Sequence, residues 1–506
     1  MSITRRFPTC KIVLILALAF LAWCSTSQVA LAAPLSSSPK STSTVTVTKL
    51  RTVTVTSTRK ASTTSSISRS TSTIKSTLVS TVTVTSHRTS STTLASSTTT
   101  KTALPSPTLS TTTTTPTSTP LPPPPPAISA KKLVAYYASW SQYAPRNYFP
   151  QDMPVELLTH VNYAFANIAG GKIAVGDQWG DVDRVFTLTD PATAKPVAFQ
   201  GAIGVLNDPR SPVRRRNPGL RSLISIGGWS WSASFSSATR TTAARATLVQ
   251  SIMDFIVQYK FDGVDIDWEY PGTEGGPGTV ANPADPGYYA QLLADLRAAL
   301  TVLAARTGRA EPYLLTVATG ASQEVYSKYD MTAFAKYVDW VNIMTYDYEG
   351  SWSSVTGPHA SIPDTLSTID GYIAKGLSPS KIALGVPFYA RAFAQVKFNP
   401  TNPGAAGVPY GSIPAGTVES GNVEYDDLKS RIMPHYQTSV DPAGAGVPSY
   451  WSVADGIWMS GEDAASAKRK GQAIVARQLA GAFWWEQSMD KNGDLVRGIR
   501  AGMGLQ

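Results

Sequence analysis

Three carboxylates stand at alternate positions within the ten residues FDGVDIDWEY, which span 261–270. Residues two apart on a β-strand point to the same face, about 6–7 Å from each other. Asp265, Asp267 and Glu269 would therefore share one face, with Asp262 just ahead of them. Two such charges repel by about 2.5 kcal/mol at an effective dielectric of about 20, and burial raises carboxyl pKa values further. The spacing predicts that at least one acid keeps its proton and can donate it.

Glu269 is the predicted proton donor, because it has the longest side chain of the three and lies nearest the end of the strand. Two other interpretations of these acids are weaker. The acids could simply face solvent, but that requires a strand with one open face. If this strand belongs to a closed parallel barrel, both of its faces are covered. A metal site needs several oxygens converging on one point. These acids follow one strand and the four His residues show no paired spacing, so we expect no metal and no cofactor.

The residues around this strand favour a sugar as substrate. Aromatic residues gather near predicted strand ends: Tyr136, Trp140, Phe165, Trp229, Trp231, Tyr346, Trp352, Tyr389, Trp484 and Trp485. A glycosidase usually needs a second carboxylate on the far side of the scissile bond. Asp267 approaches from the same side as Glu269, so it is poorly placed as a nucleophile. A 2-acetamido group on the sugar could supply the nucleophile instead, which is a known exception to the two-carboxylate rule.

Eight apolar runs are the elements that would position these residues. They are 133–140, 159–168, 222–229, 263–270, 313–320, 338–347, 381–390 and 480–486. Amphipathic segments between them predict an α/β fold, a (β/α)8 TIM barrel over 127–506. A doubly wound open sheet is the alternative, but no Gly-x-Gly-x-x-Gly follows the first run. The long connection 391–465 predicts a small α+β insertion between the seventh and eighth strands.

The N-terminal quarter has a different composition. A basic start, an apolar run and the small residues ALAA predict a secretory signal peptide over 1–33. Residues 34–126 are rich in Ser, Thr and Pro and predict a disordered stalk. The VTVT repeats within it alternate like strands, but they have too little apolar area to bury for a sheet to be expected. Both cysteines lie in the predicted signal peptide. The signal peptide predicts a secreted protein that is not bound to a membrane after cleavage. The stalk could attach it to the cell wall.

The charge of the whole chain is misleading. The net charge is +10, but 12 of the 44 Lys and Arg residues precede position 131, where no Asp or Glu occurs. The remaining segment carries 32 basic and 34 acidic residues, a net charge of −2. A segment without basic excess is not expected to bind nucleic acid.

Five motifs resemble those of the glycoside hydrolase family 18 chitinases. In chain order, they are SIGGW (225–229), DGVDIDWE (262–269), MTYDYEGSW (344–352), GVPFYAR (385–391) and GAFWWEQSMD (481–490). The second matches the family signature Asp-x-x-Asp-x-Asp-x-Glu, and the others resemble its third-, sixth-, seventh- and eighth-strand motifs. Ala390 and Ala480 stand where glycine is commoner, away from the catalytic positions. The resemblance covers about 131–506 and implies a chitinase insertion domain at 391–465.

The resemblance implies roles for the site residues. Glu269 would be the general acid and then the base, and Asp267 would stabilise the acetamido group while exchanging a proton with Asp265. Tyr346 would hydrogen-bond the acetamido oxygen, and Trp485 would form the floor under the sugar. With the aromatic strand ends, the predicted substrate-binding set is Tyr136, Phe165, Ser225, Trp229, Met344, Asp347, Tyr389, Arg391 and Trp485. Asp262, Gly227 and Gly228 are predicted to give structural support.

The predicted function is a secreted, monomeric chitinase that binds chitin or chito-oligosaccharides and hydrolyses them with retention of configuration. Three alternatives remain open. A sugar-binding lectin of the same fold would typically lack the acid. An endo-β-N-acetylglucosaminidase would act on N-glycans. A wall adhesin would have the stalk as its main functional part.

Overall fold

The computed structural model describes residues 43–58, 69–84, 131–439 and 444–505. Its contacts divide the chain into two compact units, Met1–Ser118 and Thr119–Gln506. Among the described residues, no helix is both long enough and apolar enough to cross a bilayer.

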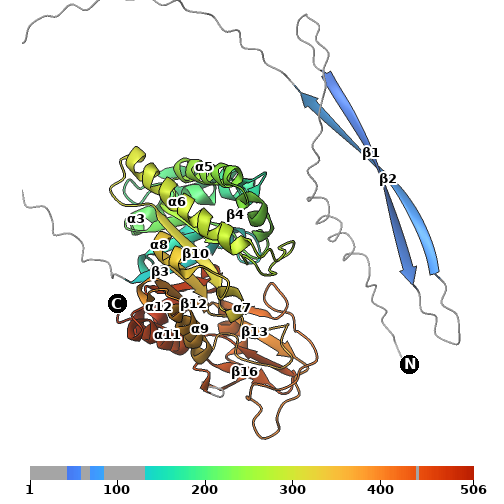
Figure 1. Ribbon diagram of the computed structural model, residues 1–506. Coiled ribbons are helices and arrows are strands. Elements are labelled where there is room, and N and C mark those ends of the chain that lie inside the picture. The colour runs from blue at the N-terminus through green and yellow to red at the C-terminus, as the bar shows by residue number, and fades with distance from the viewer. Residues whose placement is uncertain (1–42, 59–68, 85–130, 440–443, 506) are drawn as a thin grey trace, which may run out of the picture. The chain divides into compact units, whose positions relative to one another are not determined.

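The first unit contains a two-stranded antiparallel sheet. It pairs β1 (Ser43–Thr58) with β2 (Arg69–Val84), with Ser43 opposite Val84 at one end (Figure 1). This differs from the expected stalk without a sheet. The alternating Val and Thr residues are β-branched and favour extended backbone, which pairing satisfies with hydrogen bonds. The predicted signal peptide and the rest of the stalk lie outside the described residues.

The second unit is built on a closed barrel of eight parallel strands. In chain order, the strands are β3 (Lys132–Ala138), β4 (His160–Ala169), β8 (Arg221–Gly227), β9 (Gly263–Asp267), β10 (Leu314–Gly320), β11 (Trp340–Met344), β12 (Ile382–Pro387) and β18 (Gly481–Trp485). Each neighbours the next, and β18 pairs with β3 to close the ring. The predicted barrel is confirmed, and every predicted run overlaps one barrel strand, although run 381–390 also includes the start of β13 in the insertion. Predicted run 263–270 is too long, since β9 ends at Asp267.

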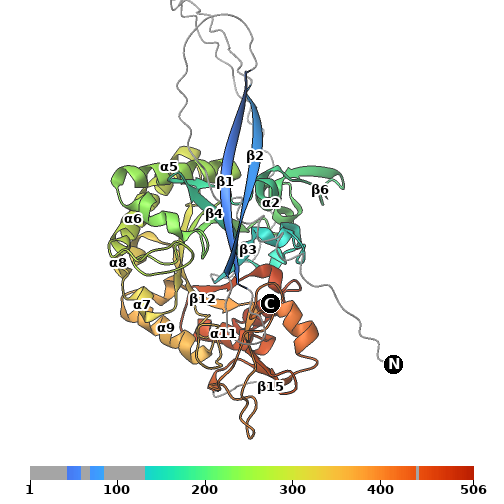
Figure 2. The same ribbon diagram turned by 90° about the vertical axis from the view of Figure 1, so that its right-hand side faces the viewer.

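Helices surround the barrel, and Figure 2 shows α5, α6, α8, α7 and α9 following one another down one side of it. Their bounds are α2 (Gly201–Asn207), α3 (Pro212–Arg216), α4 (Phe235–Thr239), α5 (Thr242–Tyr259), α6 (Asp285–Thr307), α7 (Gln323–Tyr326), α8 (Met331–Tyr337), α9 (Ile362–Ala374), α10 (Tyr425–Asp427), α11 (Ala464–Ala476) and α12 (Asp494–Gly502). The apolar faces of the long helices pack on the outer faces of the strands, where Leu248, Ile252 and Leu292 are buried.

Two connections carry extra strands. The connection from β4 to β8 holds β5 (Lys172–Ala174), β6 (Val185–Thr189) and β7 (Pro196–Gln200). The predicted insertion between β12 and β18 contains an antiparallel five-stranded sheet. Its strands are β13 (Tyr389–Ala394), β14 (Asn422–Glu424), β15 (Gln437–Ser439), β16 (Ser449–Ser452) and β17 (Ile457–Ser460). Phe393 and Trp458 are fully buried in a small core of its own.

Candidate active site

The carboxylate strand points its acids into the barrel. Asp265 and Asp267 occupy alternate positions on β9, and Glu269 lies two residues beyond the strand end. All three are buried. Trp268, between Asp267 and Glu269, turns away from them and stacks on Phe235 with ring centroids 5.0 Å apart. The predicted alternation therefore extends past the end of the strand.

Asp265 accepts side-chain hydrogen bonds from four other barrel strands. Donors to its Oδ2 are the Tyr136 hydroxyl at 2.7 Å and the Ser225 hydroxyl at 2.8 Å. Donors to its Oδ1 are the Thr316 hydroxyl at 2.5 Å and the Asn342 amide at 3.2 Å. Burial raises the pKa of Asp265, and these bonds oppose the rise because they stabilise the ionised form.

Asp267 and Glu269 have fewer partners. The Asp267 Oδ1 is buried without a hydrogen-bond partner among the described residues. Burial, together with the charges of Glu269 and Asp265, raises the pKa of Asp267 well above its usual range. Burial raises the pKa of Glu269 to about 7, with the charge of Asp347 adding to the rise and a hydrogen bond from Tyr270 opposing it. A carboxyl group with such a pKa is half protonated near neutral pH and can donate a proton.

Gly227 and Gly228 allow the end of β8 to pass close to the backbone of Asp267. Gly227 has a φ of +106°, and a Cβ there would lie 2.3 Å from the carbonyl oxygen of Asp267. Gly228 has a φ of +74°, and its N–H donates to the same oxygen at 2.8 Å. Ser232 adds a hydroxyl that accepts from the Glu269 N–H at 2.8 Å. Glycine is needed because a side chain at Gly227 would displace Asp267.

Tyr346 and Asp347 follow β11 and lie beside the acids. The Tyr346 side chain is buried and packs near Phe483, with ring centroids 6.1 Å apart. Asp347 accepts from the Tyr389 hydroxyl at 2.8 Å and from two nitrogens of Arg391 at 2.9 and 2.7 Å. Burial alone would raise the pKa of Asp347, but the nearby His359 ring and the Arg391 guanidinium outweigh it and hold the pKa far below its usual value.

Trp485 provides an aromatic surface at the end of β18. Phe165 stacks on it at 5.4 Å and 15°, and Tyr136 and Trp140 lie 5.7 and 6.0 Å from it by ring centroid. Trp140 is 41% exposed, so the aromatic surface continues from the buried acids toward solvent. Flat apolar rings of this kind suit the faces of a sugar.

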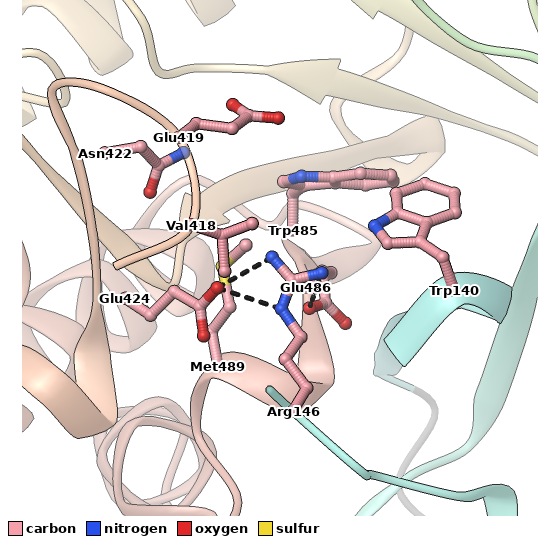
Figure 3. Close-up of a pocket in the computed structure, with 9 residues that line it drawn as sticks. All are labelled: Trp140, Arg146, Val418, Glu419, Asn422, Glu424, Trp485, Glu486 and Met489. Carbon is pink, nitrogen blue, oxygen red and sulfur yellow. Dashed lines mark hydrogen bonds and ion pairs between the residues drawn. The ribbon is translucent and has the colours of Figure 1, made fainter. Parts of the chain in front are cut away.

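A small pocket opens beside Trp140 and Trp485 (Figure 3). Behind these two rings, Arg146 donates to Glu424 of the insertion sheet at 2.9 and 2.7 Å. The same guanidinium lies 4.0 Å from Glu486, which is fully buried. Arg146 thus connects the loop after β3, the insertion sheet and the end of β18.

Two further predicted residues, Asp262 and Trp229, have surroundings of their own. Asp262 binds Arg309 at 2.6 Å and Arg214 at 3.3 Å and accepts from the Ser222 N–H at 2.8 Å, so it braces the start of β9. Trp229 is 53% exposed, and no ring contact joins it to another aromatic side chain in the described part of the chain.

Sequence reasoning missed several contacts. Thr316, Asn342, Ser232 and His359 were not singled out. The strand register could have identified Thr316. Ser225 and Thr316 both pair with Asp265 in the parallel ladder, so the three side chains lie in the same layer inside the barrel. Among the described residues, no cluster of three His, Cys, Asp or Glu side chains could hold a metal ion.

The chain is similar in sequence and in fold to known proteins. The model of the family "Glycosyl hydrolases family 18" matches residues 132–490. Chitinase A1 of Niallia circulans is 31% identical over 425 residues, an alignment that covers 74% of this chain and 59% of that protein. Chitinase 1 of Aphanocladium album is 30% identical, with 73% of this chain and 85% of the relative covered.

A solved structure is similar as well. It is a GH18 chitinase from Cycas revoluta in complex with (GlcNAc)3, with a TM-score of 0.60 and 26% identity. The similarity covers 74% of this chain and all of that chain.

Proposed function

The chain belongs to glycosyl hydrolases family 18 and is a glycoside hydrolase of the chitinase type, and from this premise we propose that it hydrolyses the β-1,4 linkages of N-acetylglucosamine polymers with Glu269 as general acid and base. The main support is the state of Glu269. Its buried carboxyl has a pKa of about 7, next to Asp267 and in the field of Asp347. A protonated acid is therefore available at neutral pH.

The reaction would run in two steps. Glu269 donates its proton to the glycosidic oxygen while the acetamido oxygen of the same sugar attacks the anomeric carbon, which breaks the bond to the leaving sugar. A cyclic cation forms, and Asp267 accepts a hydrogen bond from its N–H. Glu269 then takes a proton from water, which attacks the anomeric carbon and reopens the ring. Two inversions give retention of configuration.

The neighbouring acids affect the protonation of Asp267. In the free protein, burial and the charges of Glu269 and Asp265 favour a protonated Asp267, whose pKa is raised well above the usual range and whose Oδ1 is unpartnered within the described part of the chain. Asp265 would be the ionised member of the pair in the free protein, because four donors stabilise its carboxylate. It would take over the proton of Asp267 once the positive charge of the sugar ring favours an ionised Asp267. The Tyr346 hydroxyl would bind the acetamido oxygen, and Trp485 would lie under the sugar.

Chito-oligosaccharides are the proposed ligands. The similar Cycas revoluta chitinase was solved with (GlcNAc)3. The aromatic surface formed by Trp485, Phe165 and Trp140 supports this ligand class. We also propose that the protein is a secreted monomer, placed at the cell wall by residues 34–126, on the basis of the sequence alone.

The test compares Glu269→Gln with the matched surface variant Glu311→Gln on a defined chitin oligomer. Glu311 is exposed, away from the site. We expect mass analysis of products to show loss of hydrolysis by at least about 100-fold for Glu269→Gln and none for Glu311→Gln. NMR of the first product should show the β-anomer. Equal turnover in both variants would refute the assignment.

The same products distinguish the alternatives. A lectin would bind the oligomer and release no product. An endo-β-N-acetylglucosaminidase would cleave an N-glycan core and spare the chitin oligomer. Deletion of 35–126 should abolish wall retention and leave hydrolysis intact, whereas retained binding to walls would show that the stalk does not place the protein.

A further inference from the structure

His359 is a fully buried histidine that the proposed reaction does not use. It lies in the loop between β11 and α9. Its Nε2 is 3.1 Å from the backbone carbonyl oxygen of Tyr389, and its Nδ1 is 3.4 Å from Oδ1 of Asp347. Its ring also packs on that of Tyr389, with centroids 5.2 Å apart. Both ring nitrogens therefore face oxygen acceptors.

Asp347 needs to be held in place, because its backbone has a φ of +63°. This left-handed conformation is unfavourable for most residues that have a side chain. His359 contacts Asp347 from two directions. Its ring faces the Asp347 carboxylate, and its backbone carbonyl accepts from the next N–H, that of Tyr348, at 3.0 Å. A change at His359 would thus act directly on Asp347.

A neutral imidazole has only one N–H and cannot donate to both oxygens. The shorter contact places that proton on Nε2, bound to Tyr389. The Nδ1–Oδ1 separation exceeds the roughly 3.2 Å upper limit of a good hydrogen bond. A second proton on Nδ1 would complete a charge-assisted bond to Asp347 and shorten this contact.

The charges around the ring determine when that proton binds. Asp347 favours it, whereas Arg391 on β13 and Lys470 on α11 oppose it. Lys470 is itself paired with Glu462 at 2.5 Å, and Arg391 with Asp347. Burial is the largest influence and lowers the pKa of His359 below its usual value, so the second proton binds only on the acid side of neutrality.

We propose that His359 is a proton-dependent positioning residue: singly protonated, it anchors the Tyr389 backbone, and doubly protonated, it also clamps the Asp347 carboxylate in the substrate site. This inference rests on the proposed function, because it concerns the same site. It predicts that the protein binds its oligosaccharide more tightly on the acid side of neutrality.

Two amide variants separate the two contacts. His359→Gln places an amide nitrogen near the Nε2 position, and His359→Asn near the Nδ1 position, and neither gains a proton. We expect the KM of His359→Gln for a chromogenic chito-oligosaccharide to be about 5- to 10-fold above that of the unmodified protein at about pH 5 and within about 2-fold at about pH 8. The KM of His359→Asn, like that of His359→Gln, should vary less with pH than that of the unmodified protein.

The control is the same comparison in an Asp347→Asn background, with the thermal midpoint of each variant measured in parallel. There the Gln variant should show no pH-dependent difference, because the acceptor charge is gone. Equal KM ratios at both pH values, or the same pH-dependent ratio in the Asp347→Asn background, would overturn the proposal. Glu269→Gln stays a separate test: if it retained turnover, the proposed function would fail, whatever His359 does.

Discussion

Asp265 and Asp267 stand two residues apart on β9 but have opposite surroundings. Asp265 accepts hydrogen bonds from Tyr136, Ser225, Thr316 and Asn342, which come from four other strands. Asp267 Oδ1 is buried without a partner among the described residues. The first environment stabilises a carboxylate and the second a protonated acid. The barrel therefore orders the ionisation of the two acids, which is what a proton reserve beside Glu269 requires.

Replacement of Thr316 by Val should disturb this order. The change removes the hydroxyl that donates to Asp265 at 2.5 Å and keeps the branched shape of the side chain. A hydrogen bond to a charged group contributes about 1.5–3 kcal/mol, so we expect kcat to fall by about 10-fold or more. Steady-state kinetics on a chitin oligomer measures the effect.

Thr319→Val is the matched control for this change. Thr319 lies on the same strand and is equally buried, but it is three residues past Thr316 and its side chain is therefore on the other face of β10, where its hydroxyl lies 3.0 Å from the Tyr372 hydroxyl. It should lower the thermal midpoint without changing kcat. A similar fall in kcat for both variants would mean that Thr316 acts only through the stability of β10.

The pH dependence should report Glu269. Its pKa of about 7 means that the proton donor is lost as pH rises through that value, so kcat/KM should fall on the alkaline side of about pH 7. The negative charge of Asp347 raises this pKa, and Asp347→Asn should therefore move the alkaline limb to lower pH. If the alkaline limb stays in place or moves to higher pH, the charge of Asp347 does not raise the pKa of Glu269. Glu311→Gln should leave the profile unchanged.

Much of the fold was predictable because the barrel depends on a simple signal. Each of the eight apolar runs became one parallel strand, since a strand covered on both faces must be apolar nearly throughout. Strand ends were less predictable: the run 263–270 continues in sequence past Asp267, but the ladder stops there. Tertiary pairing, rather than residue type, decides where a strand ends.

The site was predictable where neighbouring residues in sequence carry it. The spacing of Asp265, Asp267 and Glu269 indicated a shared face, and the structure buries all three together. Contacts between distant segments correspond to no spacing in the sequence that could have predicted them. His359 lies 12 residues beyond Asp347 in a loop, and Asn342 reaches Asp265 from two strands away. Only the closed ring brings such residues together.

The role of Gly227 can be tested against a glycine with the same backbone conformation. Gly227 has a φ of +106° and a Cβ there would lie 2.3 Å from the Asp267 carbonyl oxygen, whereas Gly376 has a φ of +101° and open space around it. Gly376→Ala should cost about 1–2 kcal/mol of unfolding free energy, from the backbone alone. Gly227→Ala should cost more and should reduce kcat, because Asp267 must move.

Denaturant unfolding and steady-state kinetics of both variants provide the measurement. Equal loss of stability, with kcat preserved in Gly227→Ala, would show that the contact with Asp267 is relieved elsewhere. If Gly227→Ala does not fold, Gly228→Ala gives a second check. A Cβ at Gly228 would lie 2.6 Å from the Phe165 ring instead, so its effect should appear mainly in substrate binding.

The buried pair of Lys470 and Glu462 should stabilise the attachment of α11. The two groups are 2.5 Å apart, and both are almost fully buried. Lys470→Met would leave the Glu462 carboxylate without its cation, while the Ser466 hydroxyl still donates to it at 2.5 Å. We expect a loss of about 3–5 kcal/mol of unfolding free energy, because an unpaired buried charge is costly.

Removal of both charges provides the decisive comparison. The double variant Lys470→Met with Glu462→Leu should recover most of the lost stability, since two apolar groups can replace a buried ion pair at little cost. Lys429→Met, which breaks the partly exposed pair with Asp494, should cost less than about 1 kcal/mol. If the double variant is as unstable as Lys470→Met, then packing of the lysine chain, rather than its charge, holds α11 in place.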